Sequence, residues 1–197
     1  MRRSLPNAIR LLILGDLFMF SGFGLIGPIF AVYVSDRIPG GSIASVGYAA
    51  TIFLLTETLL KIPIGRFTDK DKGYKREALT LLIGTLIETM VPLLYLASRT
   101  MWHIYLAQVV YGIGFALAFP GWMTMFTRHA DRGHEGFEWS VYSSTIGIGG
   151  AFAAAIGGTV AQAFGFPVLF YFVFLAGVIS SLSYALLLWY TLRNGER

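Results

Sequence analysis

Residues 9–34 read IRLLILGDLFMFSGFGLIGPIFAVYV, a run that is apolar almost throughout. A transmembrane helix needs about 20 apolar residues to cross the hydrocarbon core of a bilayer, so this stretch is long enough for one crossing. It is too long for the apolar part of a secretory signal peptide, which covers about 7 to 15 residues. The stretch therefore predicts a helix that stays in the membrane.

Five more apolar runs of helix length follow along the chain. Helix-breaking or charged residues separate the runs: Pro39-Gly40-Gly41 follows the first, residues 69–76 are charged, and Gly165 precedes Pro167 at the last break. The sequence therefore predicts an all-α membrane protein whose six transmembrane helices form one domain over residues 1–197. The expected spans are residues 9–34, 43–66, 77–97, 103–127, 137–164 and 167–190.

The composition excludes several classes of function. Of the 197 residues, 55% are hydrophobic and 13% are charged, whereas soluble domains carry about 25% charged residues. The net charge of +4 comes from basic residues between the apolar runs, so we expect no nucleic-acid partner. The short connections hold no set of a nucleophile, a base and an orienting group, so we expect neither an enzyme nor a cofactor. The chain has no cysteine and its three histidines lack metal-ligand spacing, so we expect no metal site.

Lys and Arg residues fall mainly on one side of the predicted bundle. Twelve of them lie at the amino end, in the second and fourth connections and in the tail, whereas the other side has only Arg37 and Arg99. Basic residues concentrate in loops that stay cytoplasmic. We therefore expect both termini in the cytoplasm and an integral protein of the cell (inner) membrane, in contact with lipid. The twelve residues are Arg2, Arg3, Arg10, Arg66, Lys70, Lys72, Lys75, Arg76, Arg128, Arg132, Arg193 and Arg197.

The connection after the second span carries a recognisable motif. Residues 65–76 read GRFTDKDKGYKR, in which an aspartate follows a glycine by four residues and a basic turn surrounds a second glycine. This stretch resembles the loop between helices two and three of the major facilitator superfamily of secondary transporters, although the second glycine comes one residue later than usual. The resemblance implies a gating loop, formed here by Gly65, Asp69, Gly73, Lys75 and Arg76.

Two other spans are similar to the same family. In the fourth span, Gln108 stands where the family usually has an arginine, four residues before Gly112. In the fifth span, residues 149–158 read GGAFAAAIGG and resemble the family's antiporter motif, with Ala153 and Ala154 in place of Gly-Pro. Small residues also let helices pack closely in lipid, and this second interpretation is open beside the first.

The resemblance implies a single six-helix half bundle similar to the amino-terminal half of a twelve-helix transporter. The two halves of these proteins are parallel repeats with the substrate site between them. We therefore expect a parallel homodimer that carries a small-molecule substrate by alternating access, as a symporter or an antiporter. Two alternatives remain: a membrane interaction or assembly subunit that transports nothing, and a half that needs a separately encoded partner half.

Four ionisable residues lie inside predicted spans and away from the span ends: Asp16, Glu57, Lys61 and Glu88. Such a residue costs about 2.5 to 3.5 kcal/mol on insertion and marks a pathway, a partner or a proton relay. Glu57 and Lys61 are four residues apart with the acid first, which also suits a purely structural ion pair. With Lys61 paired, two acids still lack a cationic partner. Burial favours the neutral form of such an acid, so Asp16, on the helix that lines the cavity in the resembled family, is the preferred site of proton exchange.

Three further residues are candidates for the cavity. Gln108 is one by its place in the fourth span, and Tyr111 and Tyr142 lie inside spans where they either line a cavity or pack. Four tryptophans fall near predicted interfaces, where this residue type forms belts. These are Trp102, Trp122, Trp139 and Trp189.

The resemblance also suggests how two copies meet. We expect the dimer interface and cavity to involve spans one, two, four and five, with the glycines of span five at the contact. We also expect Asp69 to meet the amino end of span five of the partner, near Gly136 and Phe137, because a helix amino terminus is positive. The glycines concerned are Gly147, Gly149, Gly150, Gly157 and Gly158.

Overall fold

The computed structural model describes residues 7–70 and 74–193, and this part of the chain is helical without strands. Six helical segments are long and apolar enough to cross a membrane, with the first three elements forming one segment, Asn7–Arg37. The prediction of an all-α bundle with six spans is confirmed. The elements are α1 (Asn7–Ile26), η1 (Gly27–Ile29), α2 (Phe30–Arg37), α3 (Ile43–Thr68), α4 (Lys75–Ala97), α5 (Met101–His129), α6 (Glu135–Phe164) and α7 (Phe166–Arg193).

The first span is not one continuous helix. It breaks at the short 3₁₀ segment η1, which contains Pro28. Proline has no N–H to donate and its ring crowds the preceding turn, so the helix tightens there and restarts as α2. Pro63, Pro92 and Pro120 lie inside α3, α4 and α5 without interrupting them.

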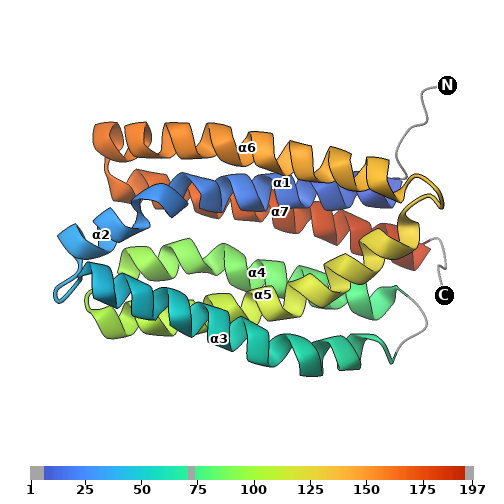
Figure 1. Cartoon of the computed structure of the whole chain (residues 1–197), viewed down its shortest axis with the longest axis horizontal. Helices are drawn as coiled ribbons and strands as arrows, with labels where there is room; N and C mark the ends of the chain where they lie inside the picture. The colour runs from blue at the N-terminus through green and yellow to red at the C-terminus, as the bar shows by residue number, and fades with distance from the viewer. Residues whose placement is uncertain (1–6, 71–73, 194–197) are drawn as a thin grey trace.

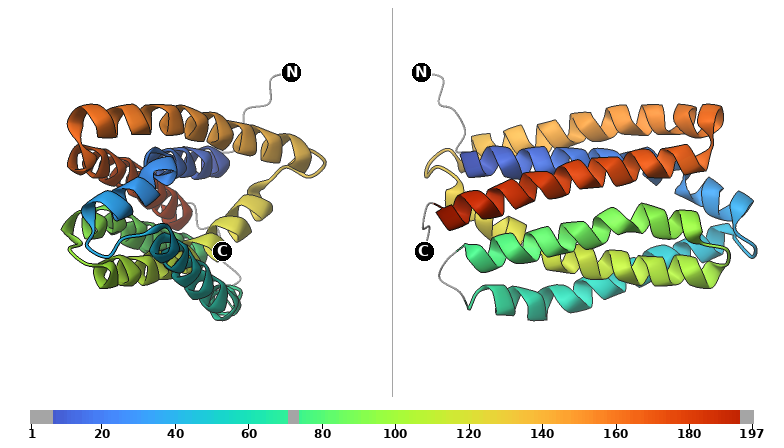
Figure 2. Two further views of the ribbon diagram at one scale, coloured as in Figure 1. Left: turned by 60° about the vertical axis from the view of Figure 1, so that its left-hand side comes forward. Right: turned by 180° about the vertical axis from the view of Figure 1, so that it is seen from behind.

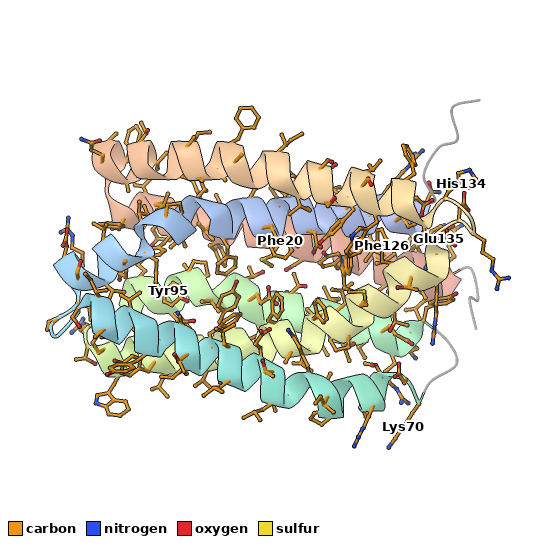
Figure 3. All side chains as sticks on the ribbon, in the orientation of Figure 1. Phe20, Lys70, Tyr95, Phe126, His134 and Glu135 are labelled. Carbon is orange, nitrogen blue, oxygen red and sulfur yellow. The ribbon has the colours of Figure 1, made fainter. Side chains whose placement is uncertain are left out.

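Successive spans run in opposite directions along the bundle (Figure 1). The start of α1, the end of α7, the end of α3 and the connection from α5 to α6 all lie at one end. Figure 3 shows Lys70, His134 and Glu135 together at that end. The basic connections therefore gather on one side of the bundle, as their sequence distribution predicts.

The helices pack as two groups of three. In one group α5 lies against α3 and α4, and in the other α1 lies against α6 and α7, while α4 and α7 join the groups (Figures 1 and 2). In an 18-residue hydrophobic stretch of α4, 50% of the residues are buried. In the corresponding stretches of α3 and α6, only 17% and 11% of the residues are buried. The two flanking helices thus keep apolar surface that this chain does not cover.

Glycines permit the closest approaches between helices. A Cβ atom at Gly84 of α4 would lie 2.5 Å from the backbone nitrogen of Ala118 and from the carbonyl oxygen of Gly114, both on α5. Small residues let helix backbones approach in this way in lipid. On α6, Gly149 and Gly157 lie against α1 in the same manner.

The glycines expected at a dimer contact therefore divide into two sets. Gly149 and Gly157 pack within the chain, so the expectation for these two is wrong. Gly147, Gly150 and Gly158 have no atom within 4 Å of the place where a Cβ would stand. Gly150 nevertheless lies against α1, because a Cβ at Gly24 would stand 3.6 Å from its Cα atom, so of these five glycines Gly147 and Gly158 remain for a contact with another helix.

A partly buried ion pair joins α4 and α5 at the end of the bundle that holds the basic connections. Glu77, near the start of α4, has a fully buried side chain, and its Oε1 atom lies 3.2 Å from Nη1 of Arg128 near the end of α5. Because a charged hydrogen bond contributes about 1.5 to 3 kcal/mol, this contact holds the ends of α4 and α5 together.

Candidate functional site

A cavity of about 200 Å³ lies where five helices meet, and it is partly open, since Phe20, Phe119 and Trp139 in its wall are exposed. Aromatic side chains form most of its wall, and two carboxyl groups, those of Asp16 and Glu88, reach it from α1 and α4. The complete lining is Asp16, Met19, Phe20, Phe23, Leu81, Thr85, Glu88, Tyr111, Phe115, Ala118, Phe119, Trp122, Met123, Trp139, Tyr142 and Tyr184.

Asp16 is fixed by two phenol groups from other helices. The hydroxyl of Tyr184 donates to Oδ1 of Asp16 at 2.6 Å, and the hydroxyl of Tyr142 donates to Oδ2 at 2.8 Å. An ionised carboxylate only accepts hydrogen bonds, so this pattern suits the charged form. The ring of Tyr184 packs directly against Gly15, where a Cβ would collide with it. The glycine next to the aspartate thus makes room for one of the donors.

Glu88 reaches the same cavity from the third span. Its side chain is buried, and its Oε1 atom has no hydrogen-bond partner among the described residues. Gly114 of α5 faces it, since a Cβ there would lie 2.9 Å from Cγ of Glu88. The structure therefore brings Asp16 and Glu88, two of the four ionisable candidates, to one cavity.

Glu57 and Lys61 form the ion pair that their spacing predicts. Nζ of Lys61 lies 2.6 Å from Oε2 of Glu57. The same ammonium group lies over the rings of Phe115 and Phe119, at 4.8 Å and 4.6 Å from their centroids. These two rings line the cavity but Glu57 and Lys61 do not, so the pair is a neighbour of the cavity.

The three further cavity candidates have different outcomes. Tyr111 and Tyr142 line the cavity, and Tyr111 stacks on both Phe23 and Phe53 with centroids 4.6 Å and 4.5 Å away. Gln108 is buried but does not line it. The structure therefore does not bring Gln108 into the site.

Sequence reasoning missed seven of the nine aromatic residues that line the cavity among the described residues: Phe20, Phe23, Phe115, Phe119, Trp122, Trp139 and Tyr184. Tyr184 was not singled out, and Trp122 and Trp139 were assigned to an interfacial belt. Trp122 is only 5% exposed, and its ring lies 6.2 Å from that of Trp139 and 4.8 Å from that of Tyr142. The belt assignment is thus wrong for Trp122. The three-residue spacing of Trp139 and Tyr142 places both on one face of α6 and could have indicated an aromatic cluster.

The sequence model of the Major Facilitator Superfamily matches residues 12–197, which is most of the chain. The chain belongs to the major facilitator superfamily. It is also 24% identical over 161 residues to a protein of Methanocaldococcus jannaschii described as an uncharacterized MFS-type transporter. That match covers 82% of this chain and 40% of the relative, so the chain spans less than half of the relative's length.

The superfamily loop motif lies at the end of the bundle beyond α3. Asp69 is exposed and caps the carboxyl end of α3, where its N–H donates to the carbonyl of Gly65 at 3.0 Å. Arg76 donates from Nη1 to the carbonyl of Phe67 at 3.0 Å and lies over the Phe67 ring. Lys75 is exposed at the start of α4, and Gly73 lies outside the described residues.

The amino end of α6, where we expected the partner's Asp69, already carries two acids. Oε2 of Glu135 accepts from the backbone N–H of Gly133 at 2.8 Å, and Oε2 of Glu138 accepts from that of Asp131 at 3.4 Å. Carboxylates are favourable at a helix amino end, so these two compensate the charge there. A second aspartate placed at this end would therefore gain less electrostatic free energy than it would gain at a helix terminus without acids.

No group of three or more His, Cys, Asp and Glu side chains within residues 7–70 and 74–193 could hold a metal ion. The cavity of this superfamily member presents two carboxyl groups and a wall of aromatic rings. Such a site can bind or release a proton and can hold a charged, partly apolar ligand.

We expect Tyr184→Phe to lower the free energy of unfolding by about 1.5 to 3 kcal/mol, because it removes a buried hydrogen bond to a carboxylate. Tyr142→Phe should have a smaller effect, since Tyr142 is only partly buried. Thermal unfolding in detergent measures both, with Tyr171→Phe, an exposed tyrosine of α7, as the matched control. Equal losses for Tyr184→Phe and Tyr171→Phe would contradict this role of Tyr184.

Proposed function

We propose that this protein is a secondary active transporter of a small solute that works as a parallel homodimer by alternating access. The observation that carries the proposal is a partly open cavity with two buried carboxyl groups, in a chain of the major facilitator superfamily. An ionisable group within the membrane is expensive and indicates a path for a solute or a proton. The transporter lies in the cell membrane with both termini in the cytoplasm.

A second six-helix unit is needed to enclose the site. Transporters of this type place the substrate between two parallel repeats, near the middle of the bilayer. The chain supplies one unit, and most residues in the hydrophobic windows of α3 and α6 are not buried within it. A second copy is the simplest source of the other unit, because twofold symmetry is the commonest way to close an assembly. The basic asymmetry gives both copies the same orientation, so the pair is parallel.

The transport cycle follows from this arrangement. The two bundles rock as rigid bodies about the cavity, and substrate binding shifts the populations of the two states. Asp16 exchanges a proton during the cycle, because its two phenol partners are neutral and leave its charge uncompensated. Glu88 adds a second carboxyl group in the same cavity.

Asp69 and Arg76 serve as the gate at the cytoplasmic end. An acid at the carboxyl end of a helix is electrostatically unfavourable, so the position of Asp69 does not stabilise α3 itself. Arg76 ties the loop back to the last turn of α3 through Phe67. Asp69 is therefore presented to the second copy when the cytoplasmic side is closed.

Transport can be tested with vesicles that contain only the purified chain. We expect saturable uptake of at least one solute from a labelled panel of organic cations, amino acids and sugars, driven by a proton gradient. Asp16→Asn keeps the shape of the side chain and removes its charge, so it should abolish the response to the gradient. Uptake only after addition of another six-helix chain would favour a separate partner half, and no flux at all would favour a non-transporting subunit.

The parallel dimer can be tested by disulfide crosslinking, since the chain has no cysteine of its own. Gly158 on α6 and Tyr48 on α3 lie about 35 Å and about 30 Å from the basic end of the bundle, at about 1.5 Å per residue. Gly158 faces open space and Tyr48 is 64% exposed. We expect chains with Gly158→Cys to crosslink to chains with Tyr48→Cys.

The matched control is Ile62→Cys, at a position that is 63% exposed on α3 but lies near the opposite end of the helix. Only an antiparallel pair would bring Ile62 of one copy to the level of Gly158 of the other. Crosslinking of Gly158→Cys with Ile62→Cys in place of Tyr48→Cys would therefore exclude the parallel dimer.

A further inference from the structure

The charge of the cavity is not balanced by the groups that line it. Asp16 and Glu88 contribute two carboxyl groups, and none of the described lining residues is basic. The partners of Asp16 are phenols, which donate hydrogen bonds but carry no charge. Oε1 of Glu88 is buried without a hydrogen-bond partner in the described part of the chain. The cavity thus offers acceptors for which the protein supplies no cation.

A basic group that lies beside the cavity wall, Lys61, is already engaged. Nζ of Lys61 lies 2.6 Å from the carboxylate of Glu57, and neither residue lines the cavity. Lys61 also shows what the wall can bind, because its ammonium group lies over the faces of Phe115 and Phe119. Aromatic faces attract cations through their negative π surface. Two rings of the wall therefore already hold a cation on one side.

The geometry points to an organic cation with bulky apolar groups as the substrate class of this cavity. The carboxyl groups of Asp16 and Glu88 provide the counter-charge, and the aromatic wall contacts the apolar groups. A sugar needs many hydrogen-bonding partners, and this wall offers few beyond the two acids, Thr85 and the phenols. A bare divalent metal ion needs more oxygen ligands than two carboxyl groups supply.

The size of the cavity agrees with a ligand shared between two copies. Pockets that bind drug-sized ligands have volumes of about 300 to 1,000 Å³. One copy supplies a cavity of about 200 Å³, so two facing copies reach this range. This assignment of a substrate class rests on the proposed transport function, but binding of the cation can be measured without transport.

The test is equilibrium binding to the purified full chain in nanodiscs with two probes of the same shape and opposite charge. Tetraphenylphosphonium and tetraphenylborate both carry four phenyl groups, so the difference between them reports the charge preference of the site. We expect saturable binding of tetraphenylphosphonium, and only unsaturable partitioning of tetraphenylborate. Equal binding of the two probes, or saturable binding of the anion alone, would overturn the assignment.

Variants locate the binding within the chain. Glu88→Gln and the double variant Asp16→Asn with Glu88→Gln should weaken tetraphenylphosphonium binding at least tenfold. Asp36→Asn, an exposed acid at the end of α2, should bind as the parent does. An affinity of the double variant within twofold of the parent would overturn the assignment. If a variant does not fold, the comparison of the two probes on the parent chain still tests the assignment of a cation as the ligand.

The same preparation separates this inference from the transport proposal. Selective, Glu88-dependent binding of tetraphenylphosphonium without flux in vesicles would support the cation site and contradict the proposed transport. Saturable flux of another solute, without binding of tetraphenylphosphonium, would support the proposed transport and contradict the cation site.

Discussion

The hydrogen bonds from Tyr142 and Tyr184 to Asp16 join α6 and α7 to α1 at one point inside the bundle. A carboxylate taken out of water is costly unless its oxygens are hydrogen bonded. Both oxygens of Asp16 find a donor, and each donor comes from a different helix. The need to satisfy one charged group therefore links these three helices at this point, and Gly15 leaves the space that Tyr184 requires.

That same interaction leaves the charge of Asp16 uncompensated. A structural ion pair would satisfy the carboxylate and neutralise it, as Arg128 does for Glu77 and Lys61 does for Glu57. The phenols satisfy Asp16 without neutralising it, and Glu88 adds a second acid to the cavity. A proton or an organic cation can then supply the missing charge, which connects the packing of the bundle to the proposed transport.

The sequence predicts the spans well because the length of an apolar run and its helix-breaking ends are local properties. The observed helices begin and end within three residues of the expected spans, and the exception at η1 follows from Pro28. The ion pair of Glu57 and Lys61 is equally local, since four residues on one helix bring the two side chains together. The family match of residues 12–197 agrees with the resemblance carried by the loop motif.

The site was harder to predict because it joins distant parts of the chain. Tyr184 is 168 residues from Asp16, and no spacing rule connects them. Membrane helices are apolar on the side that faces lipid and on the side that faces the core, so periodicity does not show which face looks inward. Trp122 therefore suited a lipid interface as well as a cavity, and Gln108 was placed in the cavity although it lies outside it.

The central claim is that the cavity opens to the two sides of the membrane in turn, and a single cysteine in its wall tests this most directly. Phe20 lines the cavity on α1, so Phe20→Cys can be labelled with a membrane-impermeant maleimide in right-side-out and inside-out vesicles. We predict labelling from both sides. When a disulfide between paired Gly158→Cys and Tyr48→Cys chains holds the outer ends together, labelling should stop from outside and become faster from the cytoplasm. Labelling from one side only, or rates unchanged by the crosslink, would contradict alternating access.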